Sequence, residues 1–325
     1  MQGSFPSLPY PFILIHPFDK ISLSLRLIYV FTINSDFEVR RVKSIPVYDR
    51  LSLCFNIDMP VRLNQKDDER IEIFYKTNER ELSSRGLFIA ESSLIIHRAL
   101  NKGYEPVCFL IEEDTYDDFK DVFDRCDSDI TVYEASDEIF KSLKGYILIK
   151  GILGLFKRKE NKSIDEILDN SNRVVVMENV ENPANVGSIF RNAAALYADA
   201  VILTDDSADP LYKRSIRVSM GNVFNIDWCY ISKDKYMNIL KKHNYKSASF
   251  ALRDNSVELE DQGLNNEEKL AIIMGSEGYG LDDKTIDQSD YVIRIDMNSE
   301  VDSLNVASAS AIALWQLCKN NRKGK

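Results

Sequence analysis

Histidine and cysteine are scarce in this sequence, which contains 3 and 5 of them among 325 residues. The cysteines are scattered, and no two of them form a C-x-x-C pair. This pattern favours neither a disulfide framework nor a zinc site, and it is typical of a cytoplasmic protein. So few histidines also leave little scope for a His-based triad or metal centre, so we expect no metal.

Long hydrophobic runs are missing as well. No window approaches about 18 uncharged apolar residues, so no membrane span is expected. The N-terminal region is apolar only in patches, and it lacks the basic start, long apolar block and small-residue cleavage site of a secretory signal. The composition, with 44% apolar and 28% charged residues, is that of a globular protein.

An excess of positive charge is the third absence. The chain carries 41 basic and 51 acidic residues, and this balance argues against a protein that coats nucleic acid non-specifically. RNA can still bind to a local basic patch. Two groups are candidates: residues 157–159 and the helically spaced trio Lys213, Arg214 and Arg217, although an ordinary solvated helix face is the alternative for both.

The pattern of apolar runs divides the chain into four parts. Residues 1–60 form an extension of unclear role, either an added edge strand or a poorly packed leader with Met59 as the true start. Residues 61–150 form a small α/β unit, 151–170 a linker, and 171–325 a longer α/β unit.

In the small unit, we expect strands at 70–75, 86–89, 107–111 and 130–133 and helices at 92–101, 116–126 and 136–141. In the longer unit, we expect strands at 173–177, 200–203, 224–230, 246–250, 270–274 and 291–295 and helices at 183–197, 213–219 and 304–319. Regular alternation of this kind predicts a parallel sheet with crossover helices, which binds its ligand at the carboxyl ends of the strands.

The first of three unusual strand ends runs from Glu178 to Arg191. Asn182 followed by Pro183 is typical of a helix start. One face of the helical wheel carries Val186, Ile189, Phe190, Ala193 and Tyr197. Arg191 lies on the opposite face, where an ordinary surface arginine is the alternative interpretation.

The second strand end, Gly275 to Leu281, follows a wholly apolar strand and contains three glycines in six residues. Closely spaced glycines let a backbone approach a ligand and present its amides, although a tight turn is the alternative. The order G-x-x-G-x-G matches neither a Rossmann fingerprint nor a P-loop, and Glu277 would repel a phosphate. The third end runs from Ile295 to the last helix, which Ser303 is expected to cap.

Together these segments resemble the SpoU family of RNA 2'-O-ribose methyltransferases in the SPOUT superfamily. The matching positions are Asn185, Gly187 and Arg191 for N-x-G-x-x-x-R, Gly275 to Leu281 for the glycine loop, and Ile295, Met297 and 303–306 for I-x-M and S-L-N-V. Asp296 departs from a usual proline and Tyr197 from a common glycine. Residues 85–103 also resemble the substrate-binding domain that precedes many family members.

The resemblance implies a parallel-sheet SPOUT domain with a C-terminal trefoil knot, which binds S-adenosylmethionine (SAM) and forms a homodimer acting on rRNA or tRNA. Residues 61–150 would then be a small α/β domain that binds the RNA substrate. The implied cofactor-binding residues are Met274, Gly275, Glu277, Gly278, Ile295, Met297, Ser303 and Leu304. The implied catalytic residues are Arg191, Asn185, Glu277, Ser303 and Asn305.

Arg191 is the residue expected to clamp the target phosphate and to lower the pKa of the attacking hydroxyl, with action as the base as the second option. Glu277 would orient Arg191, while Asn185 and Asn305 would hold the ribose or the loop. Ser303 would support Asn305 or the hydroxyl. The alternatives are a SPOUT enzyme that methylates a base nitrogen and a catalytically inactive RNA-binding or ribosome-assembly protein; a nucleotide-dependent dehydrogenase is a distant third.

Overall fold

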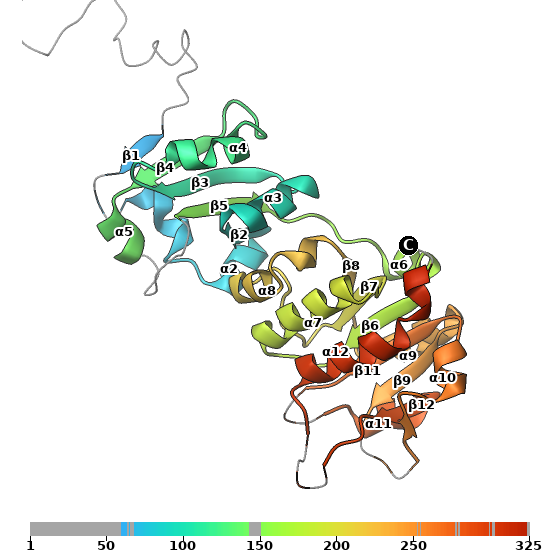
Figure 1. The fold of residues 1–325 in the computed structure, drawn as a ribbon. Coiled ribbons are helices and arrows are strands. Elements are labelled where there is room, and N and C mark those ends of the chain that lie inside the picture. The colour runs from blue at the N-terminus through green and yellow to red at the C-terminus, as the bar shows by residue number, and fades with distance from the viewer. Residues whose placement is uncertain are drawn as a thin grey trace, which may run out of the picture. The chain divides into compact units, whose positions relative to one another are not determined.

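The computed structural model describes residues 60–63, 65, 68–142, 151–251, 253, 255–276, 278, 280–298, 300 and 303–323 (Figure 1). By its internal contacts the chain divides into the units Met1–Met59 and Pro60–Lys325, and the described residues all belong to the second. The expectations for residues 1–60, a strand or a leader, therefore lie outside the described residues, apart from Pro60.

Two β-sheets form this unit. The smaller one has the order β1-β4-β3-β5-β2 and consists of β1 (Val61–Leu63), β2 (Leu87–Glu91), β3 (Pro106–Glu112), β4 (Thr131–Ala135) and β5 (Ile152–Lys157). Strands β1, β4 and β3 run parallel, whereas β5 is antiparallel to both β3 and β2.

Strand β5 corrects the expectation of a linker at 151–170. It lies between β3 and β2, and its residues are buried as far as Phe156. Gly154, within the expected linker, is a packing glycine: a Cβ there would lie 3.0 Å from the Phe109 ring. The rest of the segment leads through α6 (Ile164–Asp169), whose N-cap Ser163 accepts a hydrogen bond from the amide of Glu166.

The helices of the smaller sheet largely follow the expected pattern. They are α2 (Glu79–Ser84), α3 (Ser93–Asn101), α4 (Lys120–Phe123) and α5 (Asp137–Ser142). The strand expected at 70–75 is wrong: Glu69–Phe74 is a 3-10 helix, capped by Asp68, whose side chain accepts from the Arg70 amide. Its buried side chains, Ile71 and Phe74, stand three residues apart, which is the period of a 3-10 helix and not of a strand.

The larger sheet is wholly parallel and has the order β10-β12-β9-β11-β6-β7-β8. Its strands are β6 (Arg173–Met177), β7 (Ala200–Thr204), β8 (Asp227–Ile231), β9 (Lys246–Phe250), β10 (Val257–Glu258), β11 (Leu270–Met274) and β12 (Tyr291–Arg294). Its helices are α7 (Pro183–Ala195), α8 (Lys213–Val218), α9 (Tyr236–Lys242), α10 (Gln262–Asn266), α11 (Asp283–Gln288) and α12 (Val306–Leu317). The expected parallel sheet is confirmed.

Both faces of this sheet are covered, which explains the unbroken apolar runs of its central strands. Val174 and Val176 pack in one core cluster with residues of α6 and α9, such as Ile167 and Leu240. The alternate residues of the same strand pack in the other cluster, with α7 and α12. The central strands therefore place their carboxyl ends between two layers of helices.

The end of α7 explains one departure from the family pattern. The helix ends at Ala195, and Tyr197 has a φ of +68° and a 40% exposed side chain, so the buried position expected from the helical wheel is wrong. The amide of Ala198 donates to the Ala193 carbonyl, as in a Schellman motif. Glycine is favoured at such a position because a Cβ strains the left-handed backbone.

We predict that Tyr197→Gly is more stable than Tyr197→Ala by about 1 kcal/mol. Both substitutions remove the same ring, so their difference isolates the effect of a Cβ at positive φ. Urea unfolding of the two variants measures it. Equal stabilities would show that the backbone at Tyr197 carries no such strain.

Candidate active site

Helix α7 positions the first motif. Its N-cap Asn182 accepts a hydrogen bond from the Ala184 amide at 2.9 Å, and Pro183 occupies the first turn, as the sequence predicts. Gly187 faces α8, where a Cβ would lie 2.4 Å from the carbonyl oxygen of Ser215. The glycine of N-x-G-x-x-x-R therefore lets two helices meet, and it holds the buried Asn185 at the start of α7 in place.

The first and third motifs meet between α7 and α12, which lie side by side (Figure 1). The side-chain nitrogen of Asn305 (Nδ2) donates to the side-chain oxygen of Asn185 at 3.3 Å, although the two residues are 120 positions apart in the sequence. Two turns after Asn185 on α7, the side-chain nitrogen of Asn192 donates to the Ala307 carbonyl and to the Ser310 hydroxyl. These bonds set the two helices in register.

Asn305, and not Ser303, caps α12. Its side-chain oxygen accepts from the Ala307 amide at 2.9 Å, so the expectation of a Ser303 cap is wrong. The helix therefore begins two residues later than a Ser303 cap would require. The side-chain amide of Asn305 is used at both ends: its oxygen caps the helix, and its nitrogen binds Asn185. Ser303 and Leu304 precede the cap and are exposed, in a position where a ligand can reach them.

Arg191 is exposed on α7, opposite the buried face formed by Ile189, Phe190 and Ala193. Six residues separate it from Asn185, which is about 9 Å along the helix axis. Within the described ranges, no hydrogen bond or ion pair occupies its guanidinium. Glu277, its expected partner, lies outside the described residues, so their pairing stays a prediction.

The glycine loop after β11 closes on itself. A Cβ on Gly275 would lie 2.4 Å from the carbonyl oxygen of Gly280, and the Gly280 amide donates to the Ser276 carbonyl at 3.0 Å. Gly280 has a φ of +68°, and Gly278 is exposed at the tip. The described residues on the two sides of the loop therefore come close together, as a tight turn requires.

The other expected cofactor residues lie at the same sheet edge. Met274 ends β11 and is buried, so its side chain belongs to the core. Ile295 and Met297 follow β12 and are half-buried, while Asp296 between them is exposed. Strands β11 and β12 flank β9 in the sheet, so both loops leave from one region of the carboxyl edge.

The basic trio proposed as an RNA contact is largely occupied. The Lys213 amide lies 3.2 Å from the Glu79 carboxylate, and its ammonium lies 3.7 Å from it; Arg217 lies 3.8 Å from the buried Glu91. Both carboxylates belong to the part of the chain around the smaller sheet. Two members of the trio therefore form ion pairs within the unit, and their contact with RNA stays a prediction.

The basic run at 157–159 is similar. Arg158 lies 2.7 Å from the nearly buried Asp209, which also accepts from the Ser83 hydroxyl. Lys159 lies over the ring of Tyr104, at 5.0 Å from its centroid. Sequence reasoning did not single out three residues that make such long-range contacts, namely Glu178, Asn192 and Asp209. For Asn192 a signal was present: it is a polar residue two helical turns after Asn185.

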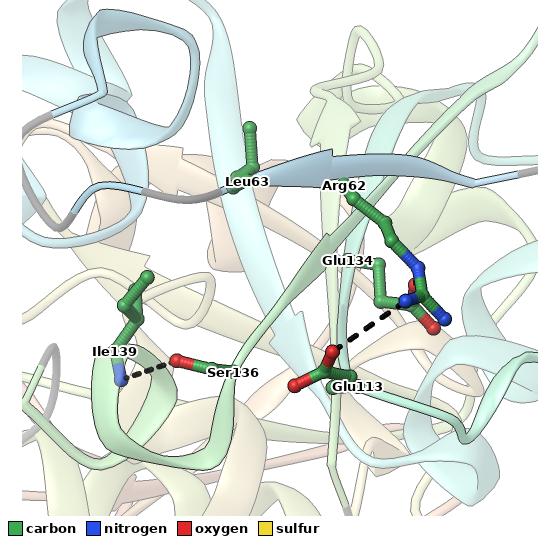
Figure 2. Close-up of a pocket in the computed structure, with 6 residues that line it drawn as sticks. All are labelled: Arg62, Leu63, Glu113, Glu134, Ser136 and Ile139. Atoms are coloured by element: carbon green, nitrogen blue, oxygen red, sulfur yellow. Dashed lines mark hydrogen bonds and ion pairs between the residues drawn. The ribbon is translucent and has the colours of Figure 1, made fainter.

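A hollow of about 200 Å³ in the smaller sheet contains none of the motif residues (Figure 2). Its lining residues are Arg62, Leu63, Glu113, Glu134, Ser136 and Ile139. Figure 2 shows the Arg62 guanidinium turned toward two carboxylates, and its Nε lies 2.8 Å from the buried Glu134. The ion pair between Arg62 and Glu134 joins β1 to β4, although the Glu134 Oε2 receives no hydrogen bond from the described residues.

The described residues contain neither a metal-binding cluster nor a helix that could span a membrane. No group of His, Cys, Asp or Glu in them is arranged to hold a metal ion. In the same residues, no helix combines the length and the apolar character needed to span a membrane. Burial raises the pKa of the Cys108 and Cys229 thiols to about 12, so both stay protonated near neutral pH.

The fold is an α/β fold with a wholly parallel sheet, and the motif residues gather at its carboxyl edge, where such sheets bind ligands. Residues 172–315 match the SpoU rRNA Methylase family. An uncharacterised tRNA/rRNA methyltransferase of Mycobacterium bovis is 30% identical over 257 residues, which cover 77% of this chain and 88% of that protein. The chain belongs to the SpoU rRNA methylase family.

Other known proteins agree with this assignment. The 23S rRNA (guanosine(2553)-2'-O)-methyltransferase RlmP of Bacillus subtilis is 25% identical over 239 residues, which cover 74% of this chain and 91% of RlmP. A solved rRNA methyltransferase from Sinorhizobium meliloti with AdoMet bound has a TM-score of 0.71 at 20% identity, over 80% of this chain and 97% of that one. The latter likeness shows the fold.

Proposed function

We propose that this protein transfers a methyl group from SAM to a ribose 2'-hydroxyl in rRNA or tRNA, and that it does so in the cytoplasm. The observation that carries the proposal is the contact between Asn185 and Asn305, which joins two motifs from distant parts of the chain at one sheet edge. RlmP, with which the chain aligns over most of its length, is named for 2'-O-methylation of 23S rRNA. A structural neighbour holds the methyl donor.

The residues present fit such a donor. The closed loop from Gly275 to Gly280 and the exposed Ser303 and Leu304 offer backbone and hydroxyl groups at the carboxyl edge. We assign the donor to these loops, with Ile295 and Met297 as its apolar contacts. We also propose that the chain after β12 forms a trefoil knot on its way to α12, as the family resemblance implies.

The proposed methyl transfer does not require a metal ion. Bound SAM supplies a methyl group on a sulfonium, which is already activated for displacement. The protein must align the attacking hydroxyl and stabilise the negative charge that develops on its oxygen. Arg191 performs the second task by holding the target phosphate and the hydroxyl, while Asn185 and Asn305 fix the surrounding loop.

Calorimetry with SAM, with its demethylated product and with NAD tests the donor. We expect heat of binding from the first two ligands only, and mapping of 2'-O-methyl sites in total RNA with and without the gene then identifies the target. Binding of NAD in preference to SAM would contradict the assignment. Binding of SAM without any change in the RNA methylation map would favour the inactive RNA-binding protein.

We further propose that the enzyme is a homodimer with the active site at the subunit interface. One stripe of α12 stays exposed and follows helical spacing from Asn305 through Ser308, Ile312 and Trp315. Ile312 is 42% and Trp315 56% exposed, which is unusual for large apolar side chains on one helix face. The stripe starts at a proposed active-site residue, so a second subunit docked on it would border the site.

We predict that Trp315→Glu weakens the dimer by at least about 30-fold, because a buried charge replaces an aromatic anchor. Light scattering over a dilution series measures the dimer, and methylation should fall with it. Val107→Glu, at a 39% exposed apolar residue in the smaller sheet, is the matched control and should leave the dimer intact. A dimer that survives Trp315→Glu would place the interface elsewhere.

A further inference from the structure

Glu178 is a buried carboxylate that the reaction described above does not use. It follows β6 directly and is 1% exposed. Its Oε2 accepts from the hydroxyls of Tyr236 and Thr285, the latter at 2.7 Å, and its Oε1 accepts from the Asp282 amide at 3.1 Å. Three donors from α9 and α11 and their flanks thus converge on one carboxylate.

These bonds hold the two ends of the glycine loop. The Glu178 amide donates to the carbonyl of Met274, the last residue before the loop, at 2.8 Å. Its side chain binds the amide of Asp282, the first residue after Leu281 and the N-cap of α11. Glu178 therefore fixes both the start and the end of Gly275–Leu281 with its own backbone and side chain.

The charge of Glu178 is compensated locally. The Lys233 ammonium lies 3.6 Å from its Oε1 and 2.9 Å from the carboxylate of Asp282. Burying an ion pair costs desolvation energy that an apolar side chain would not. A buried ion pair at this place is therefore not explained by core packing alone. Its role is explained by the bonds of Glu178 to Met274 and Asp282, which fix the two ends of the loop.

We propose that Glu178 is a positioning residue for the methyl donor: it holds the glycine loop in its closed shape before SAM arrives and never touches SAM itself. This inference rests on the proposed function, in which the loop binds the donor. A loop whose ends are loose must be ordered on binding, and the lost conformational entropy weakens affinity. Affinity for SAM should therefore depend on Glu178, and affinity for RNA should not.

Glu178→Gln tests this with nearly the same shape. We expect SAM to bind at least about tenfold more weakly by calorimetry, with unchanged RNA affinity, and the Asp282 amide to exchange its hydrogen faster. Glu181→Gln makes the same chemical change three residues later at an exposed position and should leave SAM affinity at the wild-type value. A Glu178→Gln affinity within twofold of the wild type would overturn the proposal.

A milder variant covers the case in which Glu178→Gln does not fold. Tyr236→Phe keeps the buried ring and removes one donor to Glu178, so SAM should bind about threefold more weakly and Asp282 should again exchange faster. Unchanged affinity and exchange in this variant would count against the inference. If the wild type itself bound no SAM, the proposed function would fail, and exchange at Asp282 in the variants would still decide whether Glu178 holds the loop.

Discussion

Arg191→Ala is expected to lower the rate of methyl transfer by a hundredfold or more, or about 3 kcal/mol in activation free energy, while SAM affinity stays close to the wild-type value. Arg191 is exposed on α7 and does not fill the core, so its removal should not unfold the protein. The proposed donor site is built from loops elsewhere in the chain. Single-turnover methylation at saturating RNA measures the chemical step, and calorimetry measures the donor.

Two further variants sharpen this test. Arg191→Lys should recover little of the rate, because an ammonium cannot make the two-pronged contact of a guanidinium. Arg214→Ala removes another exposed arginine, a candidate RNA contact outside the motifs; at saturating RNA it should leave the chemical step unchanged, and any effect should fall on RNA affinity. If Arg191→Ala kept most of its rate with folding and donor binding intact, the catalytic role would pass to Asn185 or Glu277.

Arg173→Met is expected to cost about 4 kcal/mol of unfolding free energy, the largest stability effect among these predictions. Arg173 is 4% exposed, and its guanidinium donates to the carbonyls of Leu317 at 3.0 Å, Glu268 at 2.7 Å and Glu267 at 2.5 Å. Methionine fills a similar space but removes the donors to all three carbonyls, of which that of Leu317 is buried and the other two are partly buried. Burial also lowers the pKa of Arg173.

The lost stability should also loosen the position of Asn305 in the proposed active site, because Leu317 is the last residue of α12 and Asn305 is its N-cap. Urea unfolding measures the free energy. Arg173→Lys should be intermediate, since an ammonium reaches fewer of the carbonyls, and Arg253→Met at an exposed arginine should cost less than about 0.5 kcal/mol. A loss below about 1 kcal/mol for Arg173→Met would mean that water or a rearranged backbone satisfies these carbonyls.

The sequence by itself determined the parallel sheet and the motifs of the larger unit. The strands at β6, β7 and β11 follow from short, largely apolar runs, because burial on both faces of a parallel sheet favours apolar side chains. The start of α7 was equally readable, since an N-cap asparagine followed by proline is a local signal. Local chemistry decides such features, so a local reading finds them.

Features that depend on distant neighbours could be decided only by the tertiary structure. Gly154 marked a linker in the sequence, yet the rings of Phe109 and Phe156 make it part of a buried strand. The sequence shows Lys213 and Arg217 as helically spaced basic residues, and only the fold places the carboxylates of Glu79 and Glu91 beside them.

The roles of Asn305 and Glu178 show the same limit in the active site. Asn305 meets Asn185 across 120 residues, and Glu178 meets Asp282 across 104. Neither partner can be chosen from residue type or spacing, because many asparagines and amides compete for each bond along the chain. Folding makes the choice: β6 and β11 pair side by side, and α7 packs against α12, so these groups come within hydrogen-bonding distance.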